Sequence, residues 1–111
     1  MINIFKYDVV IVRFPFASSL KYKARPAVVV SSDYYNQNGR DTLLILAISS
    51  NVTAKQKFEK KLIKYKEAGL LKPSIFKGSI ATIEKEFIVT KIGILSKSDQ
   101  DSLEEMIKTI C

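Results

Sequence analysis

Short runs of β-branched and other apolar residues limit the folds open to this chain more than any other sequence feature. They lie at residues 8–14, 26–31, 42–48, 75–80 and 87–95. Proline, glycine and other turn residues separate them, notably Pro15, Asn38-Gly39 and Pro73. Runs of this length and composition predict β-strands. The run at 42–48 is almost wholly apolar, which predicts a central strand.

The C-terminal end has a helical pattern instead. Ser96 or Ser98 can cap a helix there, and Asp99 and Asp101 suit its positive end. One apolar face then follows at helical spacing: Leu103, Met106, Ile107 and Ile110. Several short strands with tight links and one terminal helix predict a mainly β fold (a β-rich α+β class). We expect a small, strongly curved β-barrel with the helix packed on it.

The linking segments are polar. Residues 16–23 predict a basic loop, 32–41 a turn at Asn38-Gly39, and 82–85 a turn-like link. Residues 58–63 fit either an exposed strand or a helical turn. Residues 64–68 predict a short helix closed by Gly69, and Gly93 is a candidate β-bulge.

Charge is unevenly distributed along the 111 residues. Residues 1–80 carry 14 Lys and Arg against 5 Asp and Glu, a balance of +9, whereas residues 81–111 carry 4 against 6, a balance of −2. A basic body predicts a polyanionic partner, nucleic acid first, although a merely soluble basic surface has the same composition. The length predicts one domain, 1–111. No run is long enough to span a membrane, and a single cysteine, Cys111, favours the cytoplasm.

The residue inventory excludes several kinds of chemistry. The chain has no histidine and only one cysteine, so a histidine-based nuclease, a zinc site and a Cys/His nucleophile are ruled out. We expect no metal and no cofactor. Any reaction must use Arg, Lys, Ser, Thr, Tyr or the few carboxylates.

Arg25 stands in the basic, β-rich segment KYKARPAVVVSS, residues 21–32. Pro26 favours an extended conformation for Arg25, and Val28 to Val30 predict a stiff buried strand after it. A guanidinium held at the mouth of a strand, with a loop before it, suits a phosphate, because its planar fork matches two oxygens. The alternative is a surface ion pair.

Four pieces of the sequence, in order, resemble the MazF/PemK family of toxins from type II toxin–antitoxin systems. They are DVVIV with FPF at 8–16, ARPAVVVS at 24–31, AISSN at 47–51, and finally AGL, KPS, IATI and KIGIL between 68 and 95. Each piece alone is weak evidence for the family, but the ordered set is more specific and covers nearly the whole chain. It departs from the family pattern at Tyr7, where a glycine is usual. It also departs at Lys77 to Ser79, a segment that is shorter and lacks a carboxylate.

The resemblance implies an SH3-like (CcdB-like) barrel that forms a homodimer and is blocked by a cognate antitoxin protein. It implies metal-independent, sequence-specific cleavage of single-stranded RNA, often mRNA, that leaves a 2′,3′-cyclic phosphate. The family's catalytic arginine falls on Arg25, and its catalytic hydroxyl, usually threonine, falls on Ser49. Without the family, a serine at a strand end is more typical of a capping hydroxyl.

RNA binding is predicted for further polar and basic residues, namely Lys21, Tyr22, Lys23, Ser50, Lys77 and Ser79, with Arg13 beside them. Each has an ordinary alternative. Lys21 and Lys23 fit plain solvated lysines, and Tyr22 fits either base stacking or a dimer interface. Ser74 fits a hydrogen bond within the fold.

Two other functions are compatible with this fold. One is a toxin that poisons DNA gyrase, against which the arginine–proline pair and the serine at the strand tip both argue. The other is a non-catalytic barrel that binds RNA or protein, because a fold does not determine a function.

Overall fold

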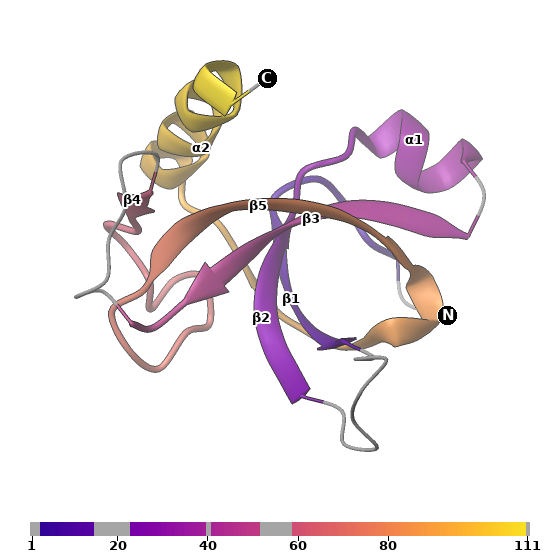
Figure 1. The fold of residues 1–111 in the computed structure, drawn as a ribbon, viewed down its shortest axis with the longest axis horizontal. Coiled ribbons are helices and arrows are strands. Elements are labelled where there is room, and N and C mark those ends of the chain that lie inside the picture. The colour runs from indigo at the N-terminus through magenta and orange to yellow at the C-terminus, as the bar shows by residue number, and fades with distance from the viewer. Residues whose placement is uncertain (1–2, 15–22, 40, 52–58, 111) are drawn as a thin grey trace.

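The computed structural model describes residues 3–14, 23–39, 41–51 and 59–110, which form a strongly curved, six-stranded sheet with helices (Figure 1). The strands are β1 (Asp8–Phe14), β2 (Lys23–Val29), β3 (Thr42–Ser49), β4 (Lys60–Lys61), β5 (Ile75–Glu84) and β6 (Ile88–Ile94). The helices are α1 (Asp33–Asn38), the 3₁₀ turn η2 (Lys85–Phe87) and α2 (Lys97–Ile110). The mainly β fold with a C-terminal helix is therefore confirmed.

The strand order is β4-β5-β3-β2-β1-β6, and every neighbouring pair is antiparallel. Because side chains alternate between the two faces of a strand, β1 to β3 bury both faces. Val10, Val29 and Ile45 belong to one core cluster, and Val9 and Leu46 to the other. Figure 1 shows that the sheet is strongly curved, and the first cluster takes most of its residues from β1, β2, β3 and β5.

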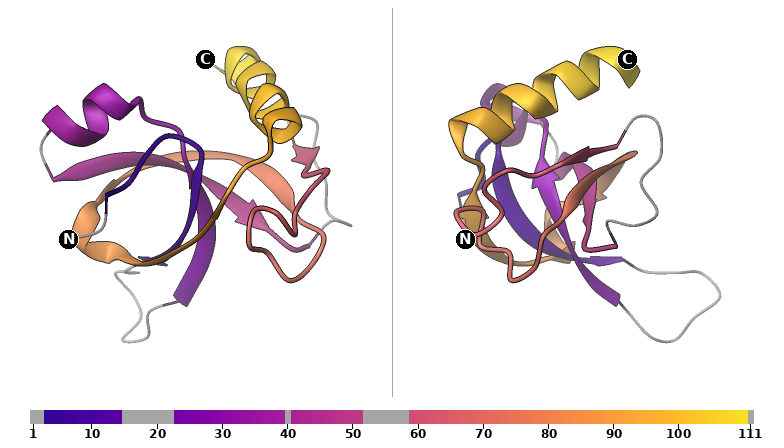
Figure 2. Two further views of the ribbon diagram at one scale, coloured as in Figure 1. Left: turned by 180° about the vertical axis from the view of Figure 1, so that it is seen from behind. Right: turned by 90° about the vertical axis from the view of Figure 1, so that its left-hand side faces the viewer.

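Helix α2 covers the second cluster. Leu103 and Met106 are fully buried there against Phe76 and Leu95. Figure 2 shows α2 lying across the outside of the sheet, on the side of β4. The predicted apolar stripe is confirmed at these two residues, while Ile110, near the helix end, stays exposed.

Three sequence-based boundaries were wrong. The segment 32–41 contains helix α1 rather than only a turn, because Ser32 caps it by accepting a hydrogen bond from the Tyr35 amide at 3.1 Å. β5 continues through 82–84, where a turn-like link was expected, because Thr82 and Glu84 pair with β3. β2 begins at Lys23, three residues early, so Arg25 lies inside the strand opposite Val12 and not at its mouth.

The remaining local predictions hold in part. Residues 65–69 form a single turn rather than a helix, and Gly69 closes it with a φ of 84°. Only Lys60 and Lys61 of the segment 58–63 form a strand, and Phe58 lies outside the described residues. Gly93 borders a β-bulge, and Ser96 is the residue that caps α2. Within the described ranges, no helix is long and apolar enough to cross a membrane.

Candidate functional site

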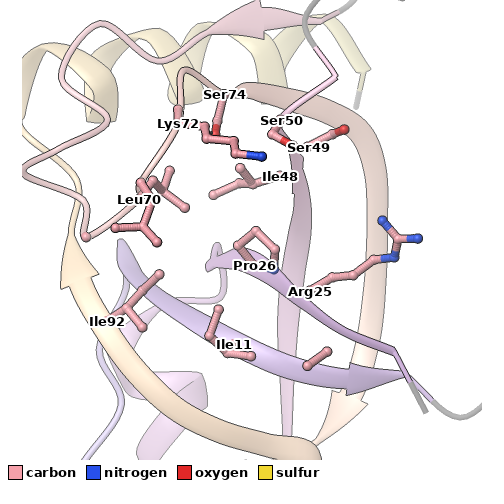
Figure 3. Close-up of a pocket in the computed structure, with 13 residues that line it drawn as sticks. Ile11, Arg25, Pro26, Ile48, Ser49, Ser50, Leu70, Lys72, Ser74 and Ile92 are labelled. Atoms are coloured by element: carbon pink, nitrogen blue, oxygen red, sulfur yellow. The ribbon is translucent and has the colours of Figure 1, made fainter. Parts of the chain in front are cut away.

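Arg25 and Ser49 project from neighbouring strands on the same face of the sheet. Ala27 pairs with Ala47 in the β2–β3 ladder. Continuing that register by two residues places Arg25 opposite Ser49, and alternation gives their side chains a common face. Figure 3 shows both side chains extending to the same side. The shared location that their predicted roles require is therefore present.

The two strands end their pairing next to this point. Pro26 has no amide hydrogen to donate, which accounts for the β2–β3 ladder stopping at Ala27. A pocket of about 440 Å³ opens beyond it. Its wall consists of Ile11, Ala24, Arg25, Pro26, Ile48, Ser49, Ser50, Gly69, Leu70, Leu71, Lys72, Ser74 and Ile92. The ends of β2 and β3 thus form one side of the pocket, and the loop after Gly69 forms another.

The Arg25 guanidinium is exposed and available. Across the ranges that the structure describes, no carboxylate forms an ion pair with it. The surface ion pair that the sequence left open is thus not formed with any described residue. A permanently charged fork that pairs with no described carboxylate is suited to an anion from solution.

Ser49 forms a capping contact, and its own hydroxyl hydrogen has no acceptor among the described residues. Its Oγ accepts a hydrogen bond from the Asn51 amide at 3.1 Å, which is the capping contact that a serine at a strand end predicts. A hydroxyl that accepts one bond still has its own hydrogen to donate. The capping contact therefore orients Ser49 without using its proton.

The other predicted RNA-binding residues are dispersed. Ser50 lines the pocket beside Ser49, whereas Lys77 and Ser79 lie on β5 and do not line it. The Lys77 ammonium pairs with Glu59, whose carboxylate is 5% exposed, so Lys77 has a structural role already. Lys21, Tyr22 and the Lys23 side chain lie outside the described residues.

Sequence reasoning assigned no role to the loop that completes the pocket. Leu70, Leu71 and Lys72 all line it, and in Figure 3 the Lys72 ammonium points toward the end of β3 that carries Ser49 and Ser50. The KPS piece at 72–74 was part of the family resemblance, but nothing in the sequence indicated which strand end it would face. Only the fold brings the loop to β3.

Close backbone contacts hold this loop in position. Gly69 and Gly93 lie so close that an added Cβ at Gly93 would meet the Ala68 carbonyl group at 2.5 Å. The Ser74 hydroxyl donates to the Lys72 carbonyl at 2.9 Å, which is the hydrogen bond within the fold left open for Ser74. The Leu62 amide donates to the Ser74 carbonyl at 2.9 Å. The loop is therefore attached at both ends.

Comparisons with known proteins agree with this fold. Residues 6–111 match the family of PemK-like, MazF-like toxins of type II toxin–antitoxin systems. No curated protein gives a significant match. Among solved structures, a MazF toxin of Mycobacterium tuberculosis is 21% identical with a TM-score of 0.72, covering 93% of this chain and 94% of that one.

Two further structures are complexes with a partner protein. An endoribonuclease from a mycobacterial species, in complex with its cognate antitoxin, is 14% identical with a TM-score of 0.73, covering 99% of this chain and 94% of that one. A MazE–MazF complex from Deinococcus radiodurans contains a chain that is 17% identical with a TM-score of 0.75, at the same coverage of 99% and 94%. At these identities the likeness shows the fold.

Proposed function

Since this chain belongs to the family of PemK-like, MazF-like toxins of type II toxin–antitoxin systems, we propose that it is a sequence-specific endoribonuclease acting on single-stranded RNA. The observation that carries the proposal is the shared face of Arg25 and Ser49 beside a pocket, with the guanidinium exposed. The net charge of +7 suits a polyanionic substrate.

The reaction uses the nucleophile that RNA itself carries. The 2′-oxygen attacks the adjacent phosphorus, its proton leaves, the bond from phosphorus to the 5′-oxygen breaks, and the 5′-oxygen takes up a proton. The products are a 2′,3′-cyclic phosphate and a 5′-hydroxyl end. The enzyme must align these atoms and stabilise the extra negative charge on the phosphate.

Arg25 and Ser49 divide this work. Arg25 donates two hydrogen bonds to the phosphate oxygens as their charge grows, an effect worth roughly 10²–10³ in rate. Ser49 donates its hydroxyl hydrogen to a phosphate oxygen or orients the 2′-hydroxyl. Because the chain contains no histidine, proton transfer falls to water or to Arg25 itself.

The test is cleavage of a long single-stranded RNA in the presence of EDTA. The wild type is expected to produce discrete fragments that end in a cyclic phosphate, detected by mass spectrometry. Arg25→Ala and Arg25→Lys should both lose about 10²–10³ in rate, because lysine lacks the planar fork. Ser49→Thr should keep activity and Ser49→Ala lose most of it. Lys97→Ala, an exposed lysine on α2, is the matched control.

The other outcomes separate the alternatives. Full activity in Arg25→Ala would exclude its assigned role. Salt-sensitive RNA binding without cleavage would indicate a binding barrel, and gyrase-dependent breaks in DNA would indicate a gyrase poison.

We propose an antitoxin partner and a homodimer as well. The complexes of similar chains with an antitoxin support the first, and an acidic segment lying over Arg25 and Lys72 would block RNA. Light scattering of the purified protein, alone and with the product of an adjacent gene, tests both assemblies.

A further inference from the structure

The floor of the pocket is apolar and lies on the other face of the sheet from Arg25 and Ser49. Ile11 pairs with Pro26 in the β1–β2 ladder, so the two share a face, and Ile48 points away from its neighbour Ser49. Figure 3 shows Leu70 and Ile92 closing the opposite side. The volume of about 440 Å³ falls within the range of small-ligand pockets.

Leu71 extends this apolar surface to the rim. Its side chain is 96% exposed. A single exposed leucine on a protein surface is ordinary, but this one adjoins an open apolar floor and stands on a loop held by backbone contacts. Floor and rim together offer one continuous apolar surface to a flat ligand.

The charged groups stand on the rim and not in the floor. Lys72 is exposed, and within the described part of the chain no carboxylate pairs with it. Its ammonium points across the pocket toward Ser49 and Ser50. A ligand that fits must be apolar where it is buried and negative where it leaves the pocket.

A nucleotide has this distribution of polarity, because its base has apolar faces and its phosphate lies outside the base. We propose that the pocket is a subsite for one unstacked base of the RNA, and that Lys72 binds the phosphate of the same nucleotide. This subsite rests on the proposed function, since it places that base next to the phosphate held by Arg25. RNA is favoured over an acidic peptide because Arg25 and Ser49, the groups proposed to hold the neighbouring phosphate, stand on the two strand ends that border the pocket.

The experiment separates binding from cleavage. Short homo-oligonucleotides of each base, 2′-O-methylated so that no nucleophile remains, are titrated into the purified protein. Binding is followed by fluorescence anisotropy and by NMR of the methyl groups. The methyl groups of Ile11, Ile48, Leu70, Leu71 and Ile92 are expected to shift saturably, with one base binding more tightly than the others.

Two variants divide the phosphate contact from the base contact. Lys72→Ala should weaken binding about tenfold and reduce the slope of log K against log salt by about 0.7, while Lys72→Arg restores both. Leu71→Asn, at a fully exposed position, should weaken binding about three- to tenfold and leave the salt slope unchanged. Lys66→Ala, an exposed lysine outside the pocket, should change neither quantity.

Three results would overturn the subsite. In the first, wild type, Lys72→Ala and Leu71→Asn bind and cleave RNA equally well. This result would exclude the subsite and leave the proposed function intact. In the second, oligonucleotides bind without shifting the pocket methyl groups, which would also exclude the subsite and leave the proposed function intact. If no oligonucleotide binds but an acidic peptide shifts those methyl groups, the pocket is a peptide site and the subsite fails, whereas the proposed function is decided by the cleavage of the long RNA.

Discussion

At the scale of single residues, Tyr7 departs furthest from expectation. Its φ of 76° lies in the left-handed region, which favours glycine. A side chain there costs about 1–2 kcal/mol. Compensating contacts surround it: the Tyr7 amide donates to the Val29 carbonyl at 2.9 Å, and its hydroxyl donates to Glu104 of α2 at 2.5 Å. These hydrogen bonds thus offset the backbone strain at Tyr7 and attach it to helix α2.

Glu104 is the acceptor in this attachment, and its ionisation makes the attachment pH-dependent. The hydrogen bond from Lys6, at 2.8 Å, and then the one from Tyr7, lower the pKa of Glu104 from its ordinary value of 4.5. A carboxyl group with a lowered pKa in the folded state stabilises the fold above pH 4.5 and loses that contribution as the pH falls further.

Glu104→Gln is therefore expected to reduce stability at neutral pH and to have a smaller effect at pH values well below 4.5. Urea unfolding across this pH range measures the difference, in low salt because the pair is partly exposed. Glu105→Gln, the exposed neighbour that pairs with Lys60 at 3.3 Å, is the control. If the free energies of unfolding of wild type and Glu104→Gln differ by the same amount at all pH values, the ionisation of Glu104 does not explain the difference.

At the scale of elements, the segment from Leu62 to Ser74 is held between α2 and β6. The buried carboxylate of Asp99, in the first turn of α2, accepts from the amides of Ile63 at 2.7 Å and Lys64 at 2.9 Å. On the other side, Gly69 lies against the backbone of Ile92 in β6. The two contacts position the loop that lines the pocket.

The close approach of Gly69 allows a sharp test. Gly69→Ala would place a Cβ on the Ile92 carbonyl oxygen and force alanine to a φ of 84°. We expect a loss of about 3 kcal/mol or more in the free energy of unfolding. Gly78→Ala is the matched control, because the nearest atom there is the Ile110 Cδ1 at 3.8 Å, and its effect should stay within about 0.5 kcal/mol.

Chemical denaturation of wild type, Gly69→Ala and Gly78→Ala measures these losses of stability. Equal stability of Gly69→Ala and Gly78→Ala would show that the loop adjusts freely. The positioning of Lys72 by the fold would then have no support.

At the scale of the whole molecule, charge is divided along the chain. The first 80 residues carry a balance of +9 and include both Arg25 and Lys72, while the last 31 carry −2 and include α2. A basic surface that neutralises phosphates releases their counterions, so RNA affinity falls as salt rises.

We expect log K for single-stranded RNA to fall linearly with log salt, by about 0.7 for each phosphate contacted. Arg25→Ala should reduce the slope by about one such contact, whereas Lys97→Ala on α2 should leave it unchanged. Fluorescence anisotropy at several salt concentrations measures both slopes. A slope near zero for the wild type would exclude electrostatic binding of the RNA backbone.

The secondary structure could be predicted where apolar residues repeat with a clear period. β1, β3 and α2 were located from such patterns because burial of one face, or of both, leaves a regular trace in the sequence. Helix α1 was missed because it is six residues long and depends on the Ser32 cap more than on an apolar face. The full length of β5 was missed because its exposed residues 78–82 show no alternation.

By itself, the sequence determined which chemistry is possible: a basic chain without histidine, an arginine before a proline, and a serine at the end of an apolar strand. These are properties of single residues and near neighbours. Only the tertiary structure decided that Lys77 is paired with Glu59 and that the loop with Leu71 and Lys72 reaches the end of β3. Those contacts join segments far apart in the chain, and they depend on the register of strand pairing and on the closeness of Gly69 to β6.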